Sequence, residues 1–136
     1  MTVSEKQQQL IDDYGLIENP QERLGAVVDA ARQIPRFTES ERSDDNLVPG
    51  CQSRVWLIGE FHDGRCRFRT DCDSPMVAGL VALQTQPYHD SVPDEIAAHP
   101  PRVLEELGLL RDLTPTRQNG LAAVHQRVVA FARSNR

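Results

Sequence analysis

The segment from Arg65 to Cys72 constrains the fold most, because its side chains change character at every second position. The two resulting sets are Cys66, Phe68, Thr70 and Cys72 on one side, and Arg65, Arg67, Arg69 and Asp71 on the other. A period of two is that of a β-strand with one buried face and one solvated face. The turn signal His62-Asp63-Gly64 and the apolar run from Val55 to Ile58 precede it, so the sequence predicts an antiparallel hairpin.

Helix signals dominate the rest of the chain. Ser4 with Gln7 is typical of a capping box, and several predicted helices begin with a capping residue followed by proline. The predicted helices run from Ser4 to Tyr14, from Asn19 to before Pro35, from Ser74 to about Gln86, as two short helices between Pro93 and Gly108, and from Thr114 onward. With a hairpin among helices and no linker, we expect one α+β domain over residues 1–136, in which helices cover a small antiparallel sheet.

Charge and composition narrow the functional classes. The net charge of −5 argues against a nucleic-acid binder, which would present a basic patch. No apolar run approaches the length of about 20 residues that a membrane span needs, and the polar N-terminus does not resemble a signal peptide. We therefore expect a cytoplasmic protein without a membrane partner. Its three cysteines are then expected to be free thiols, metal ligands or catalytic groups.

Cys51 is the first candidate for a reactive group. It follows a predicted loop from Arg36 to Gly50, and loops of about fifteen residues in compact domains are often functional. Gly50 permits backbone angles that other residues avoid, and Pro49 stiffens one side of this possible hinge. From this local pattern alone, both a reactive thiolate and a partly buried structural thiol remain open.

The other cysteines suggest an alternative. Cys66 is predicted on the inward face of its strand, as a small core residue. Cys72 lies at the end of that strand and would approach Cys51 if the two strands met there. A metal or Fe–S scaffold using Cys51, Cys66 and Cys72, with His62 as a fourth possible zinc ligand, is therefore the second hypothesis. The absence of a paired Cys-x-x-Cys motif counts against it, so no metal is assigned.

Three ordered blocks resemble a known family. They are Gly50 to Trp56, then Asp71-Cys72-Asp73 with the Val77, Gly79, Leu80 and Ala82 that follow, and Leu113 to Leu121. Together they are collinear with the SufE family of sulfur acceptors for cysteine desulfurases, over roughly Ser4 to Arg133. The third block resembles the "L-T-P-S-R-x-x-G-L" segment of that family.

This resemblance implies both a fold and a chemistry. The fold would be a three-stranded antiparallel sheet packed with helices, as in IscU-type scaffold proteins. The chemistry would be persulfide transfer: a desulfurase of the SufS or CsdA type, which carries the pyridoxal phosphate, passes sulfur to Cys51. An Fe–S scaffold resembling SufBCD would then receive it. The chain itself would hold no cofactor and would be a co-substrate rather than a stand-alone enzyme.

The resemblance also implies supporting residues. Gly50, Gln52, Asp73 and Arg117 are expected to support the loop or contact an anion, with Asp73 as the partner of Arg117. Arg117 would stabilise a thiolate or persulfide, or tether the loop to the helix. Cys72 stands where the family usually has serine. We expect it to be a bystander, since a resolving thiol near Cys51 would undermine sulfur carriage.

Overall fold

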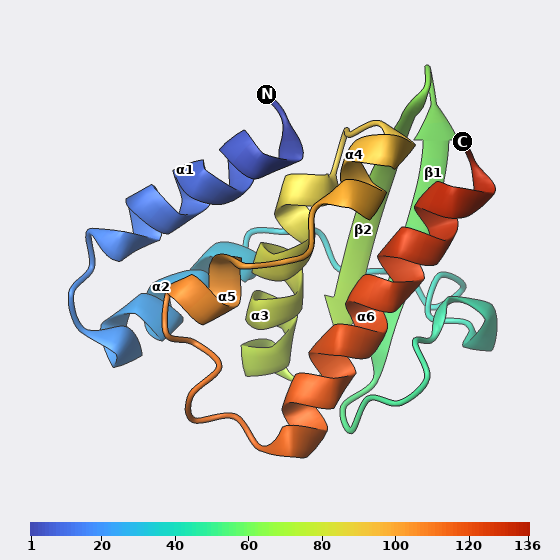
Figure 1. Ribbon diagram of the computed structural model, residues 1–136. Coiled ribbons are helices and arrows are strands. Elements are labelled where there is room, and N and C mark those ends of the chain that lie inside the picture. The colour runs from blue at the N-terminus through green and yellow to red at the C-terminus, as the bar shows by residue number, and fades with distance from the viewer.

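The computed structural model describes all residues from Met1 to Arg136 (Figure 1). A single β-hairpin is inserted into a chain of helices. In chain order the elements are α1 (Val3–Gly15), α2 (Pro20–Ala31), η1 (Asp44–Asn46), β1 (Val55–His62), β2 (Arg65–Cys72), α3 (Pro75–Thr85), η2 (Gln86–Tyr88), α4 (Pro93–Ala98), α5 (Val103–Glu106) and α6 (Pro115–Ser134). None of these helices is both long enough and apolar enough to cross a membrane.

Most helix starts follow the sequence signals. Asn19, Ser74 and Thr114 each accept a backbone N–H of the following turn, and each is followed by proline in the first helical turn. The capping box of α1 was predicted two residues too late: Thr2 and Glu5 form it, not Ser4 and Gln7.

Gln7 is instead a buried tertiary contact. Only 2% of it is exposed, its amide donates to the Pro100 carbonyl at 3.2 Å, and its side-chain oxygen accepts the Arg102 N–H at 2.9 Å. This side chain ties α1 to the segment before α5. The sequence pattern of one helix cannot predict such a contact, because the partner residues lie far away in the chain.

The hairpin is longer and the sheet smaller than predicted. Strand β1 continues to His62, beyond the predicted end at Ile58, and the two strands pair from Val55↔Cys72 to His62↔Arg65. The sheet has two strands, so the expected third strand is not confirmed. Single bridges, Leu47↔Trp56 and Cys66↔Ser91, replace it at the two edges.

The alternation along β2 is confirmed at six of its eight positions; Thr70 is only half-buried, and Asp71 is buried. Cys66, Phe68 and Cys72 are buried, and the three arginines of the strand are exposed. Asp71 was predicted on the solvated face, but it is 6% exposed because the segment before β1 folds over it. Its carboxylate accepts from Arg36 at 2.8 Å, Arg42 at 2.9 Å, the Phe37 N–H at 3.2 Å and the Cys72 N–H at 2.9 Å. Asp71 therefore fastens the long loop to the sheet.

Helices α3 and α6 pack on the inner side of the hairpin (Figure 1). Leu80 and Val81 of α3 and Val124 and Val128 of α6 are at most 1% exposed and form the centre of the core. Phe131 of α6 meets Phe68 edge to face, with 5.5 Å between ring centroids. Nearer its start, α6 contacts the segment that contains Cys51 through Gly120 and Ala123.

Gly59 is required where α6 crosses β1. A Cβ added there would lie 2.7 Å from the Phe131 ring, so Gly59→Ala is expected to lower the free energy of unfolding by about 1–3 kcal/mol. Gly25→Ala is the matched control: it has open space in α2 and is expected to stabilise by about 0.5–1 kcal/mol. Urea titration measures both, and Phe131→Leu should relieve much of the Gly59→Ala loss. An equal loss in both glycine variants would contradict this packing.

Candidate functional site

Cys51 lies at the tip of a short closed loop. The Val48 N–H donates to the Val55 carbonyl at 2.8 Å, and the Asp73 N–H donates to the Arg54 carbonyl at 3.1 Å at the base of the hairpin. Between these anchors the chain turns through Gly50, whose φ of +87° is a left-handed conformation that favours glycine. The backbone conformation at this position is therefore one that glycine adopts without strain, while the expected hinge role of Gly50 stays a prediction.

The thiol of Cys51 points toward the start of α6. Its Sγ lies 3.5 Å from the Gly120 carbonyl oxygen, to which the S–H can donate. A Cβ on Gly120 would lie 3.6 Å from Sγ, an ordinary van der Waals contact, so the thiol packs directly against this turn of the helix.

A small cavity of about 20 Å³ adjoins the thiol. Its wall is mostly apolar and comes from the loop, β1, α3 and α6. The residues are Cys51, Gln52, Ser53, Val55, Val77, Leu80, Val81, Leu113, Arg117, Gly120 and Leu121. A space of this size holds about one water-sized atom. The site can thus accept one additional atom on Cys51 without unpacking the core.

Burial sets the resting chemistry of the thiol. Removal from water raises the pKa of Cys51 above its ordinary value, because an apolar wall disfavours the thiolate. The bond to Gly120 acts in the same direction, since only the protonated thiol can donate it. The side chain is therefore a neutral, poorly nucleophilic thiol in this conformation.

Arg117 brings an unused cationic donor to the same cavity. Its Nη1 atom is buried and has no hydrogen-bond partner in the protein. The expected pair between Arg117 and Asp73 is not formed: Asp73 Oδ1 accepts the Arg54 N–H at 3.1 Å instead. Asp73 therefore holds the base of the loop. Gln52 and Arg117 line the cavity with Cys51, and Gly50 lies directly beside it in the chain.

Cys51 and Cys72 lie close enough for their charges to interact, but Cys66 is remote from both, so the three cysteines do not form one cluster. Cys72 is 3% exposed at the base of β2, where burial raises its pKa to about 11, and its sulfur accepts the Ser74 N–H at 3.5 Å. Cys66 lies at the other end of the hairpin, opposite Phe61. All three are free thiols, and no three His, Cys, Asp or Glu side chains are grouped to hold a metal ion. The scaffold alternative required all three cysteines to converge.

Together, the fold and site define an α+β protein that shelters one cysteine at a loop tip, next to a cavity of atomic size. The sequence matches the SufE family, described as an Fe-S metabolism associated domain, over residues 8–132. The chain therefore belongs to the SufE family, and the resemblance seen in the sequence is confirmed. Membership of this family assigns the protein a role in Fe–S metabolism.

One curated relative supports this assignment, and one solved structure shares the fold. An uncharacterised SufE-like protein of Rhizobium etli is 31% identical over 125 residues, which cover 88% of this chain and 84% of that protein. The solution structure of a hypothetical protein from Thermus thermophilus superimposes with a TM-score of 0.76. It is 20% identical, and the match covers 96% of this chain and 95% of that one. At that identity the second comparison shows the shared fold alone.

Proposed function

We propose that this protein accepts sulfur from a pyridoxal-phosphate-dependent cysteine desulfurase and carries it as a persulfide on Cys51. The observation that supports this most is the thiol itself, which is sheltered beside a cavity of about 20 Å³. That volume suits one extra sulfur atom and little else. Family membership supports the same role, because it assigns the chain to Fe–S metabolism.

The transfer is a thiol exchange. The Cys51 thiolate attacks the outer sulfur of the desulfurase persulfide, and a new S–S bond forms as the old one breaks. The desulfurase cysteine leaves as a thiolate and takes up a proton, while Cys51 now carries the outer sulfur. One S–S bond replaces another, so no external oxidant or reductant is required.

The raised pKa of Cys51 gives the loop a protective function. At rest, burial and the Gly120 carbonyl keep the thiol neutral, so it reacts poorly with stray electrophiles. Swinging the tip outward about Gly50 exposes the thiol to water, and its pKa then falls toward the ordinary value. The Cys51 thiolate forms only when the loop leaves the cavity, and docking to the desulfurase triggers this movement.

Arg117 then stabilises the loaded state. When the tip returns, an ionised outer sulfur occupies the cavity with the buried Nη1 as a charge-assisted donor. The sulfur subsequently passes to an Fe–S scaffold of the SufBCD type. The pyridoxal phosphate stays on the desulfurase, of the SufS or CsdA type, and this chain needs no cofactor for its part of the reaction.

Stimulation of a desulfurase tests the proposal. A SufS-type desulfurase is supplied with cysteine, and alanine formation is measured with and without the reduced protein, in the absence of other thiols. We expect alanine formation to rise and to saturate with increasing protein. Protein alkylated at Cys51 should give no rise. Equal stimulation by the alkylated protein would mean that docking, rather than sulfur acceptance, activates the enzyme.

Arg117→Met is expected to shorten the lifetime of the persulfide without preventing its formation. Loss of one charge-assisted hydrogen bond corresponds to about a tenfold faster release of sulfur to dithiothreitol. Arg133→Met, at an exposed position of the same helix, is the control and should match the wild type. Release rates from the pre-loaded proteins measure the effect. Identical rates of sulfur release from the wild type, Arg117→Met and Arg133→Met would show that Arg117 does not stabilise the persulfide.

A further inference from the structure

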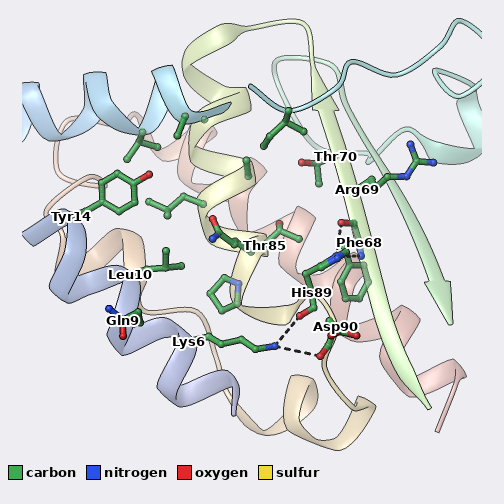
Figure 2. Close-up of a pocket in the computed structure, with 18 of the residues that line it drawn as sticks. Lys6, Gln9, Leu10, Tyr14, Phe68, Arg69, Thr70, Thr85, His89 and Asp90 are labelled. Carbon is green, nitrogen blue, oxygen red and sulfur yellow. Dashed lines mark hydrogen bonds between the residues drawn. The ribbon is translucent and has the colours of Figure 1, made fainter. Parts of the chain in front are cut away.

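A second and much larger cavity, of about 850 Å³, opens between α1, α2, β2 and the end of α3 (Figure 2). It shares no lining residue with the cavity of Cys51. Helix α3 separates the two: Gly79, Ala82 and Leu83 face the large cavity, whereas Leu80 and Val81 face the small one. Its volume lies in the range of about 300–1,000 Å³ that is usual for small-molecule sites.

The walls of the cavity are built from apolar side chains of several elements. Figure 2 shows Leu10 and Tyr14 of α1 on one side and Phe68 of β2 on the other. Val27 of α2 and Leu83 of α3 also line it. A ligand would therefore bury apolar surface against the protein, which is the main source of affinity in sites of this kind.

Charged side chains at the cavity are already occupied by partners within the protein. The pairs are Arg69 with Glu41 at 2.7 Å, Lys6 with the His89 carbonyl at 2.9 Å, Asp13 with the Gln9 amide at 3.0 Å, and Asp90 with Arg67 at 3.7 Å. Two cationic and two anionic side chains among the lining residues also balance in charge. This arrangement favours a neutral ligand over an ion.

The hydroxyl of Thr85 is the first polar group left free. Thr85 is 5% exposed at the end of α3, and its Oγ1 has no hydrogen-bond partner. Figure 2 shows it among the side chains that surround the cavity. Buried polar atoms without partners are rare in folded proteins, because each forgoes the hydrogen bonds that water would give it. A ligand in this cavity could supply the missing partner.

The backbone of Thr70 is the second free group. Cys66 exchanges backbone bonds with Ser91 at the outer edge of β2, and the His89 ring lies 3.0 Å from the Phe68 nitrogen at the same edge. By the period of two, the N–H and C=O of Thr70 point to this edge as well. No hydrogen bond from another part of the chain reaches them there, and Thr70 lines the cavity.

The open edge is one residue long. His89 covers it at Phe68, and Arg36 covers it beyond Thr70, where its Nη2 lies 3.4 Å from the Cys72 carbonyl oxygen. An added peptide strand would need several consecutive pairs, so this window is too short for one. A single amide group fits it, since its oxygen can accept from the Thr70 N–H and its N–H can donate to the Thr70 carbonyl.

We propose that this cavity binds a neutral, largely apolar small molecule that carries one amide group. The amide pairs with the backbone of Thr70, a further polar atom of the ligand reaches the Thr85 hydroxyl, and the apolar parts lie between Leu10, Tyr14 and Phe68. This binding activity is separate from sulfur transfer and does not use Cys51. It goes beyond the proposed function, and either can fail without the other.

N-benzylbenzamide is a suitable probe, because two apolar rings flank one amide. We expect titration into the ¹⁵N-labelled full-length protein to shift the backbone resonances of Phe68, Thr70 and Thr85 saturably. Benzyl benzoate, an ester of the same shape without the N–H donor, should bind at least about tenfold more weakly. Equal affinity for the ester, shifts confined to other regions, or no saturable shifts would each overturn the proposal.

Variants separate the cavity from nonspecific binding. Ala82→Phe places a ring in the cavity and should abolish the shifts. Thr85→Val keeps the shape but removes the hydroxyl, so we expect about fivefold weaker binding and a melting temperature about 4 °C higher, as the unpartnered group is lost. Thr116→Val, exposed on α6, is the control and should change neither value. Binding of the probe to Ala82→Phe as tight as to the wild type would contradict the assignment. So would a Thr85→Val variant that binds the probe as tightly as the wild type and melts at a lower temperature.

Discussion

Replacing Cys51 with serine is expected to abolish sulfur acceptance and to reduce stimulation of the desulfurase to the level measured without the protein. A serine hydroxyl ionises far too weakly to attack a persulfide sulfur. The substitution preserves the fold, because serine fills nearly the same space and can donate to the same Gly120 carbonyl. Alanine formation and the mass of the recovered protein measure the loss, and circular dichroism checks the fold.

Cys66→Ala is the matched control for this experiment. Cys66 is fully buried at the far end of the hairpin, so its loss should leave stimulation unchanged. Cys72→Ser should also retain stimulation, as expected of a bystander thiol. Stimulation that survives in Cys51→Ser, or that disappears in Cys66→Ala, would be incompatible with a relay through Cys51 alone.

The second large effect is expected at Asp71. Asp71→Asn should lower the free energy of unfolding by about 2–3 kcal/mol, because the buried carboxylate accepts from two arginines and two backbone N–H groups. The asparagine side chain keeps one accepting oxygen, but its NH₂ group replaces the other oxygen and faces N–H groups that it cannot accept from. Asp29→Asn is the control: its pair with Arg32 is exposed and should contribute less than about 0.5 kcal/mol. Denaturant titrations compare the two, and equal losses would refute the role of Asp71.

The same carboxylate makes stability depend on pH. Burial tends to raise the pKa of Asp71, but the N–H groups of Cys72 and Phe37, with Arg42 and Arg36, outweigh it and lower the pKa. A group with a depressed pKa stabilises the fold above its unfolded value, near pH 4, and loses that effect as pH falls through the folded value. The difference in the free energy of unfolding between the wild type and Asp71→Asn should therefore be largest at pH 7 and decrease in acid. A gap that stays constant between pH 7 and pH 2 would contradict this.

Local patterns in the sequence predicted the elements that depend on near neighbours. Most of the alternation of β2 and the proline-marked helix starts follow from residues a few positions apart, and the structure confirms them. Cys51 could be singled out for the same reason, because it directly follows Pro49-Gly50 between a long loop and a strand. The resemblance to the SufE family is confirmed, and it is the basis for the hypothesis that Cys51 is reactive, which the local pattern left open.

Features that depend on distant partners could not be predicted in this way. Asp71 alternates like a solvated residue, and its burial results from Arg36 and Arg42 in a loop about thirty residues earlier. Gln7 was mistaken for a capping residue because its partners lie beyond residue 99. Asp73 was expected to pair with Arg117 because a cation at a helix N-terminus favours an acidic partner outside the helix, whereas the Asp73 carboxylate accepts the Arg54 N–H instead. In each case a tertiary contact outweighed the local preference.

Mapping sulfur onto the cysteines tests the central claim most directly. The reduced protein is mixed with a SufS-type desulfurase and cysteine, and intact and peptide mass spectra are recorded under conditions that preserve persulfides. We predict a gain equal to one sulfur atom on the peptide containing Cys51, and none on the peptides of Cys66 and Cys72. An unmodified Cys51 beside an active desulfurase, or sulfur carried by Cys66 or Cys72 instead, would contradict the assignment of Cys51 as the sulfur acceptor.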